Sequence, residues 1–326
     1  MNSRRTGWLN RPRAWSASRR GMMEKCPRAW ALKYGFNRKF SGTFNRHLIN
    51  ISDWSSPWRL MQRALRGVII DRLDLHSKGK DWPEDDLAMR IRHRIIGALE
   101  RQRTTVKLVE LRLGDSSKLR VEIENEEINR LVEIACYRFH SAVKSEPIAS
   151  ILRGDIVEWF TCSRLEKTKL DRWDLHVAPD IVWRQGRNWH LLKLTVQGTA
   201  IPVKHRRLET NAMVLWGLFR TGMPAMANRF VVETLTWNRG RWRHWSEHAS
   251  NRLVDDATML IKSDMQAMTD LYLKMGDSCD LSQLPLAEQR RTCRNCGHID
   301  TCPGGEDLQR GRLEQSALEM AKASSE

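Results

Sequence analysis

The sequence has no uninterrupted run of about 18 apolar residues, the minimum that a helix needs to cross a bilayer. Its basic start is not followed by an apolar segment of the kind that a secretory signal contains. The seven cysteines are an odd number, which argues against a secreted scaffold built on disulfides. We therefore expect a soluble, cytoplasmic protein that makes no contact with membranes.

Acidic residues are scarce relative to basic ones. The chain has 55 Lys and Arg against 39 Asp and Glu, a formal net charge of +16. The first 23 residues contain six arginines and no acid, which leaves an organellar transit peptide as an alternative. Because Cys26 follows directly behind them, we favour a functional basic arm. A charge of this size indicates a polyanionic partner.

The phosphate-binding pattern Gly-x4-Gly-Lys-Ser/Thr is also missing, so an ATP-driven motor must be a separate protein. The 326 residues are enough for a substantial core. We expect four regions: a basic arm at 1–45, a helical region at 46–120, a mixed core at 121–248, and a C-terminal region at 249–326.

The basic residues form clusters interleaved with tryptophan, a pattern that suits phosphate contacts combined with base stacking on single strands. The alternative is that these charges are solvated faces and the tryptophans belong to the core. The tryptophans in question are Trp8, Trp15, Trp58, Trp237, Trp242 and Trp245. The predicted nucleic-acid-binding residues are Lys204, Arg206, Arg207, Arg241, Trp242 and Arg243.

Four cysteines form a set split between the two ends of the chain: Cys26, and the trio Cys293, Cys296 and Cys302. Four thiolates are the ligand set of a 4Fe-4S cluster or of a structural zinc. Cys26 is the expected fourth donor because Pro27 follows it and the flanking pattern predicts two short helices that meet there. The alternative is a C-terminal zinc knuckle with an unrelated Cys26. We interpret Cys136, Cys162 and Cys279 as buried thiols.

Apolar spacing predicts helices over residues 47–75, 84–113, 124–144, 203–221 and 249–275. Strands are expected over residues 155–162, 175–184, 189–196, 229–237 and up to about Trp245. This order indicates an α+β protein. No internal repeat is visible.

The order of helix, three strands, helix and strand resembles the αβββαβ core of the PD-(D/E)XK nucleases. Pro179 and Asp180 begin the predicted hairpin, and Leu191-Leu192-Lys193 stands at the place of the acid-x-Lys motif of that family. The split cysteine set is similar to the iron-sulfur branch, which includes RecB- and AddB-type recombination nucleases and a CRISPR-associated 4Fe-4S exonuclease. The resemblance implies a restriction-endonuclease-like core with a helical N-terminal insertion and a C-terminal iron-sulfur staple.

In that family two carboxylates hold Mg²⁺ or Mn²⁺ and a lysine orients the attacking water. The resemblance implies that Asp180 holds a metal and that Lys193 faces the water. The second acid, however, is Leu191, which cannot ligate a cation. The candidates to replace the missing second carboxylate are Glu158, which would share the metal with Asp180, and Glu209 and Asp71. Asp71 stands where the branch has a histidine. The alternatives are that Asp180 is a relic, and that Lys193 only extends to the surface.

Three functions follow from this reading. The first is a DNA-binding protein that has lost or weakened its cleavage and that grips a single strand or a duplex end. The second is an active metal-dependent nuclease with a relocated carboxylate. The third is a zinc-stapled scaffold that binds RNA or protein. The resemblance implies partners from DNA repair and recombination, such as helicases, or from CRISPR and anti-phage defence systems.

Overall fold

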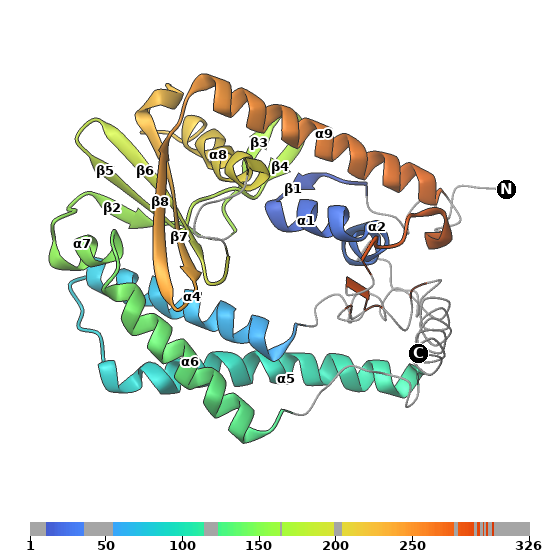
Figure 1. The fold of residues 1–326 in the computed structure, drawn as a ribbon, viewed down its shortest axis with the longest axis horizontal. Helices are drawn as coiled ribbons and strands as arrows, with labels where there is room; N and C mark the ends of the chain where they lie inside the picture. The colour runs from blue at the N-terminus through green and yellow to red at the C-terminus, as the bar shows by residue number, and fades with distance from the viewer. Residues whose placement is uncertain are drawn as a thin grey trace, which may run out of the picture.

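The computed structural model describes residues 11–35, 55–113, 123–163, 165–198, 204–276 and 280–289, together with residues 292, 293, 296, 298 and 302. The side chains of 104–113 and 204–205 lie outside this description. The described residues form helices and two sheets, each of which has both parallel and antiparallel strand pairs (Figure 1). The chain is therefore an α+β protein, as the order of predicted elements indicates. No helix among the described residues is long and apolar enough to cross a membrane.

The helices begin where the sequence supplies a cap. Ser16 and Ser56 each accept a hydrogen bond from the backbone N–H three residues ahead, and Ser250 does the same. Pro57 stands in the first turn of its helix, where its missing N–H costs nothing. The α-helices are α1 (Ala17–Lys25), α2 (Pro27–Trp30), α4 (Pro57–Ser77), α5 (Leu87–Leu113), α6 (Asn125–Val143), α7 (Ile148–Arg153), α8 (Lys204–Leu218) and α9 (Asn251–Met275). Shorter helical turns are a π-helical turn, η1 (Ala31–Gly35), and the 3₁₀ turns η2 (Glu84–Asp86), η4 (Ala227–Arg229) and η5 (Leu281–Gln283).

The larger sheet has five strands in the order β2-β5-β6-β7-β8. Its pairs are antiparallel except for β6 and β7, which run parallel and are joined through α8. The strands are β2 (Trp159–Thr161), β5 (Ile181–Gln185), β6 (Asn188–Thr195), β7 (Phe230–Asn238) and β8 (Arg241–His248). A smaller sheet has the order β1-β4-β3, with β1 (Ala14–Trp15), β3 (Thr168–Leu170) and β4 (Trp173–Leu175).

Both faces of the five-stranded sheet are covered. Alternate strand residues point to opposite faces, so Val182, Leu191 and Val232 join one core and Ile181 and Leu192 join the other. Helices α8 and α9 cover the first face, whereas α4, α5 and α6 cover the second (Figure 1). Loss of water from these two apolar layers is the main stabilising contribution.

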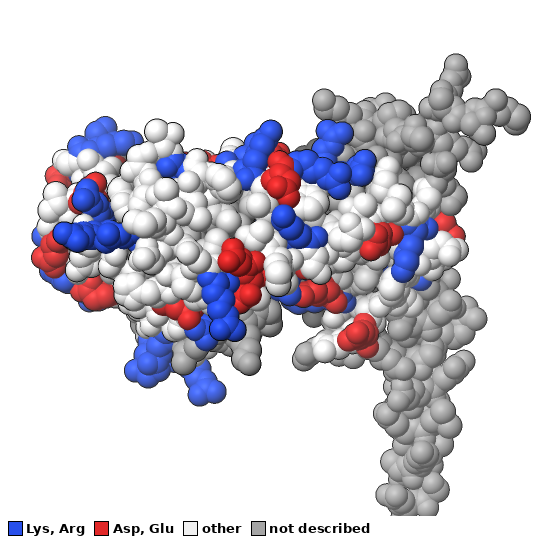
Figure 2. Space-filling model, turned by 90° about the horizontal axis from the view of Figure 1, so that it is seen from above, with Lys and Arg blue, Asp and Glu red and all other residues white. Residues whose placement is uncertain are grey.

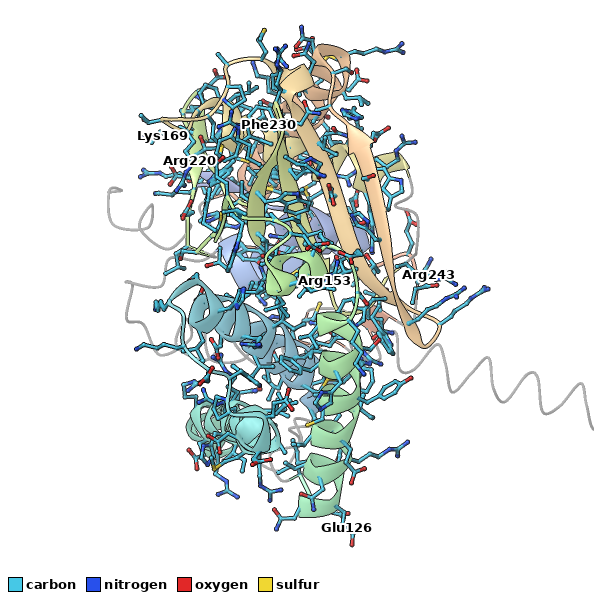
Figure 3. All side chains as sticks on the ribbon, turned by 90° about the vertical axis from the view of Figure 1, so that its left-hand side faces the viewer. Glu126, Arg153, Lys169, Arg220, Phe230 and Arg243 are labelled. Atoms are coloured by element: carbon cyan, nitrogen blue, oxygen red, sulfur yellow. The ribbon has the colours of Figure 1, made fainter. Side chains whose placement is uncertain are left out.

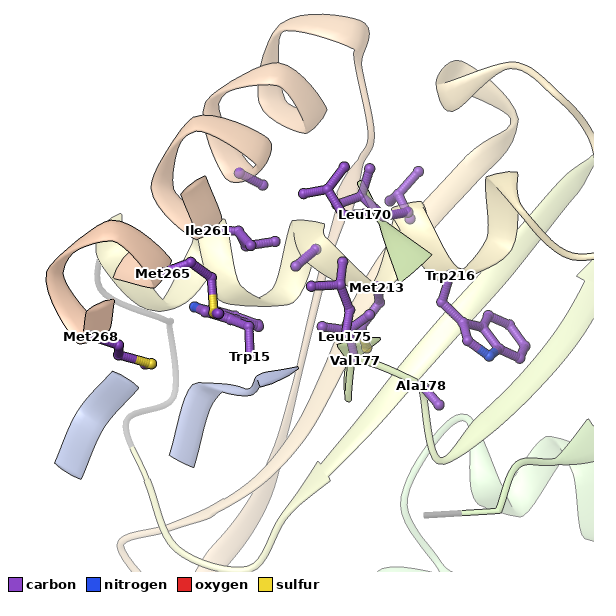
Figure 4. Packing of buried hydrophobic residues seen from close by; sticks show 14 of the residues in the cluster. Trp15, Leu170, Leu175, Val177, Ala178, Met213, Trp216, Ile261, Met265 and Met268 are labelled. Atoms are coloured by element: carbon purple, nitrogen blue, oxygen red, sulfur yellow. The ribbon is translucent and has the colours of Figure 1, made fainter. Parts of the chain in front are cut away.

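The first core also holds the N-terminal segment in place. The Trp15 ring is fully buried against α9, where Ile261, Met265 and Met268 pack around it (Figure 4). Its indole Nε1 donates a 2.8 Å hydrogen bond to Asp264. Residues far apart in the sequence therefore share one core, and this core crosses the boundaries of the four predicted regions, which stay a prediction.

The predicted helices agree closely with the observed ones, and two short helices do meet at Cys26. The predicted strand over 175–184 was wrong as a single element. Leu175 ends β4 in the small sheet, and β5 begins only at Ile181. The strand over 155–162 is shorter than predicted, since β2 spans only Trp159–Thr161. The segment between β4 and β5 leads from the small sheet to the five-stranded sheet, where Asp180 stands directly before β5.

Candidate functional site

Asp180 lies directly before β5 and is almost fully buried, with 1% of its surface exposed. Its backbone N–H donates to Leu192 O on β6 at 2.7 Å, which places it opposite Lys193. Its Oδ2 accepts a hydrogen bond from the backbone N–H of Leu194 at 2.7 Å. The ammonium group of Lys193 lies 3.5 Å from Oδ1 and donates to Ala178 O at 2.9 Å. The sequence pattern thus correctly brought Asp180 and Lys193 together.

A second cation reaches the same carboxylate. The guanidinium of Arg66, on α4, forms an ion pair with Oδ1 of Asp180. Arg66 is itself buried. The carboxylate is therefore surrounded by two positive side chains and a backbone N–H. Sequence reasoning missed Arg66, although it stands directly before Gly67, the first residue of the segment in which Asp71 was singled out.

Leu191, at the position where the resemblance implies a second acid, lies in apolar surroundings. Leu191 is fully buried and lies between Val182 of β5 and Val232 of β7. These three side chains belong to the core beneath α8 and α9. A divalent cation needs several oxygen ligands in one place, and this position supplies none.

The structure does not place Glu158 at the site, and its proposed sharing of a metal with Asp180 was wrong. Glu158 is exposed and pairs with Arg184 at 3.4 Å, near the far end of β5. Four residues of extended strand separate Arg184 from Asp180, which corresponds to about 13 Å. A single metal ion cannot bridge that distance.

The other two replacement carboxylates are also engaged elsewhere. Glu209 on α8 accepts a hydrogen bond from Arg20 of α1 at 2.9 Å. Asp71 on α4 pairs with Arg94 of α5 at 2.5 Å. Each carboxylate thus has an arginine partner, and the roles of Glu209 and Asp71 beside Asp180 stay predictions. Among the described residues, no group of three or more His, Cys, Asp or Glu side chains is arranged to hold a metal ion.

The four predicted cysteines do come together. Burial raises the pKa of the Cys296 thiol to about 11; a backbone hydrogen bond at His298 opposes the rise, and the nearby Cys26, Cys302 and Cys293 thiols add to it. Burial also raises the pKa of Cys302, against the opposing charge of Arg28 and with a further contribution from Cys26 and Cys293. The mutual influence of the thiols indicates that they lie near one another, and thiolates are the donors that iron-sulfur clusters and zinc take; a cofactor at this set stays a prediction.

Cys26 occupies a defined corner of the backbone. It caps α2, and its Sγ accepts from the backbone N–H of Ala29 at 3.5 Å. Two residues later, Arg28 donates to Leu284 O at 2.7 Å and to Ser282 O at 3.0 Å. The N-terminal helices are thus tied to the segment that leads into the cysteine trio. Of the other cysteines, Cys162 is buried, Cys136 is half-buried, and Cys279 lies outside the described residues.

The predicted nucleic-acid-binding arginines gather at the edge strand β8 and the start of α8. Arg207 of α8 forms an ion pair with Glu247 of β8, and its guanidinium lies 5.6 Å from the Trp245 ring. Arg206 and Arg241 are exposed, and Arg243 is half-buried. Figure 3 shows Arg243 at the outer side of the sheet. The side chain of Lys204 lies outside the described residues.

Several of the tryptophans expected to stack on bases belong to the core instead. Trp15, Trp237 and Trp242 are buried, so the prediction that Trp242 contacts nucleic acid was wrong. Trp242 turns inward because its indole Nε1 donates to Arg138 O at 2.9 Å. Trp58 and Trp245 are half-buried, and Trp8 lies outside the described residues. Acidic side chains interrupt the basic ones over the face in Figure 2. On this face the positive charge is therefore spread among acidic side chains.

A polar cluster around the buried Glu233 was not anticipated. Glu233 of β7 accepts hydrogen bonds from His190 of β6, at 2.5 Å, and from His244 of β8. Burial alone would raise the pKa of Glu233, but the two histidine hydrogen bonds outweigh it and the pKa is lowered. His190 also stacks on Trp183, with ring centroids 4.8 Å apart. The three polar residues are dispersed in sequence, and only the strand register brings them together.

Comparison of the chain with protein-family models, with curated proteins and with solved structures finds no match in any of the three. The resemblance to the PD-(D/E)XK nucleases therefore depends on this chain's own motifs and on the arrangement of its strands.

Proposed function

We propose that this chain is a nuclease-fold DNA-binding protein that grips a single strand or a duplex end and does not cleave it. The observation that carries the proposal is the environment of Asp180. Two cations, Arg66 and Lys193, lie against its carboxylate, and Leu191 fills the place of the second acid. The site therefore repels a divalent cation, whereas its net positive charge favours a phosphate.

The topology supports the restriction-endonuclease-like part of the proposal. The elements α6, β2, β5, β6, α8 and β7 follow one another in the αβββαβ order. Within the five-stranded sheet, the parallel pair is the one joined through α8. The small sheet inserts β3 and β4 between β2 and β5, and α4 and α5 precede the core as a helical addition.

We propose that Cys26, Cys293, Cys296 and Cys302 hold a 4Fe-4S cluster, with structural zinc as the alternative. When bound, this cofactor would supply a covalent link between the two ends of the chain. Arg28 and the capping position of Cys26 place one donor on a rigid corner, and the trio brings the other three. Anaerobic purification followed by analysis of iron, acid-labile sulfide and zinc distinguishes the two cofactors.

The predicted partners are DNA and a protein of a recombination, repair, CRISPR or defence complex that supplies the motor or the cleavage. The edge formed by β8 and the start of α8 supports DNA as the ligand, because Arg206 and Arg241 are exposed there and Arg243 is half-buried. Edge strand β8 and its turn thus form the proposed DNA-binding face.

The test measures binding and cleavage on the same samples. Wild-type protein is incubated with end-labelled single-stranded and duplex DNA, with Mg²⁺, with Mn²⁺ and without metal, over a range of salt. We expect salt-dependent binding and no metal-dependent cleavage. Cleavage by the wild type that disappears in both Asp180→Asn and Lys193→Ala would overturn the proposal that this chain does not cleave DNA. Binding that is absent at low salt would overturn the DNA-binding function itself.

A further inference from the structure

A large aromatic side chain is exposed to solvent near the hairpin of β7 and β8. Tyr137, on α6, is 64% exposed, which makes it one of the most exposed large side chains of the described residues. Its ring meets the buried Trp237 ring edge-on, with centroids 5.9 Å apart and an interplanar angle of 90°. An edge-to-face contact fixes the orientation of Tyr137 while most of its surface stays open to a ligand.

The residues beneath Tyr137 are held rigidly. The guanidinium of Arg138 lies between two indoles, 5.0 Å from the ring of Trp58 and 5.0 Å from that of Trp237. Arg138 also donates to Val196 O at 3.3 Å, and its own carbonyl accepts from Trp242. This part of α6 is therefore bound to the β7–β8 hairpin on both sides, and Tyr137 does not have to be ordered when a ligand arrives.

Positive charge lies on the turn that follows Trp237. This turn contains Arg239 and Gly240, both with positive φ, at +47° and +81°. Arg239 is exposed. Figure 3 shows the hairpin reaching down beside α6, in agreement with the contact between Tyr137 and Trp237. Arg241 is also exposed, but it pairs with Asn238 and so points to the sheet face opposite Trp237.

We propose that Tyr137 and Arg239 form a platform for an unpaired nucleotide, with the base stacked on the tyrosine and a phosphate on the arginine. The proposal rests on the DNA-binding function and specifies it: the ligand of this surface is single-stranded DNA. Aromatic rings stack on any base whose face is free, and guanidinium groups bind the backbone beside it. In a duplex the base faces are already stacked, so the tyrosine has no partner there.

The experiment compares two exposed aromatic residues. Phe219, just after α8, is 61% exposed and serves as the matched control for Tyr137. Dissociation constants for fluorescein-labelled oligo(dT) and for a duplex of equal length are measured by anisotropy with wild type, Tyr137→Ala, Tyr137→Phe and Phe219→Ala. Tyr137→Ala should weaken oligo(dT) binding by about 5- to 100-fold, as expected for the loss of one stacked base, with a smaller effect on the duplex. Tyr137→Phe and Phe219→Ala should bind like wild type.

A second readout tests the arginine. Replacing Arg239 by serine should reduce the slope of log affinity against log salt by about 0.7, the contribution of one single-strand phosphate contact. If wild type binds oligo(dT) and Tyr137→Ala binds it equally well, the platform is wrong while the DNA-binding function stands. If wild type binds neither DNA, both proposals fail. Equal losses in Tyr137→Ala and Phe219→Ala would also overturn the platform.

Discussion

The guanidinium of Arg66 on α4 forms an ion pair with the carboxylate of Asp180 at the start of β5, and both groups are buried. This contact joins the helical layer to the sheet at the point where the family resemblance implies a metal ion. The guanidinium neutralises part of the charge of the buried carboxylate. The pair has a direct consequence for stability, because either partner alone leaves a buried charge.

Arg66→Met should destabilise the protein by about 3–5 kcal/mol, since it leaves the Asp180 carboxylate buried with one cation fewer. Equilibrium unfolding in urea measures the change. The double variant Arg66→Met/Asp180→Asn should recover part of the loss, because the two side chains are coupled. Arg94→Met is the matched control: its pair with Asp71 is substantially exposed, so its loss should cost at most about 1 kcal/mol. Equal costs for the two single variants would contradict the buried pair.

Cys296→Ala should lower the metal content, the melting temperature and the DNA affinity together, because the cofactor we propose would link both ends of the chain. Cys136→Ala, at a half-buried position on α6, should leave all three unchanged. Elemental analysis and thermal melting of proteins purified without oxygen provide the comparison. A Cys296→Ala protein that melts and binds like wild type would rule out a stapling role.

Glu233 should make stability depend on pH in the acid range. Its pKa in the folded protein is lowered, so its carboxylate stabilises the fold above the pKa of the unfolded chain, about 4.3. That contribution is lost as the pH falls through the lower, folded value. Glu233→Gln should cost about 1–3 kcal/mol near neutral pH, because His190 and His244 then share a weaker acceptor. The difference between the two proteins should shrink below about pH 4; a constant difference down to the lowest pH would argue against the assignment.

Gly217→Ala should destabilise the contact between α8 and the sheet by about 1–3 kcal/mol. A Cβ at this position would lie 2.6 Å from Cε1 of Phe230, a fully buried residue of β7. Gly21→Ala is the opposite case, since a Cβ on that helical glycine meets nothing within 4 Å. It should raise stability by up to about 1 kcal/mol through the unfolded chain. Chemical denaturation of the two variants tests the sign of both effects.

The sequence predicted the helices well because capping serines, Pro57 and an apolar face act locally. It failed at residues 175–184, where the backbone leaves one sheet and enters another. Pro179 and Asp180 interrupt the apolar residues and are a local signal against one continuous strand. The sheet that the first half joins is set by the pairing of β4 with β3 and with β1, a strand some 160 residues earlier in the chain.

The candidate site likewise has one part that the sequence predicts and one part that it does not. Asp180 and Lys193 were found because hairpin register is a short-range property. Their partner Arg66 comes from a helix more than a hundred residues earlier. The candidate Glu209 is engaged by Arg20, 189 residues away in the sequence, and Asp71 by Arg94, 23 residues away. The position of a carboxylate on a predicted element says little about which arginine will reach it after the helices pack.

The distribution of the four cysteines also sets an order of events during protein synthesis. Cys26 leaves the ribosome early, and residues 293–302 follow almost a whole chain later. At about 5–20 residues per second, this delay is on the order of 15 to 55 s. During that interval the four-thiol site that we propose would lack three of its donors. Closure of this site would therefore have to follow the synthesis of residues 293–302.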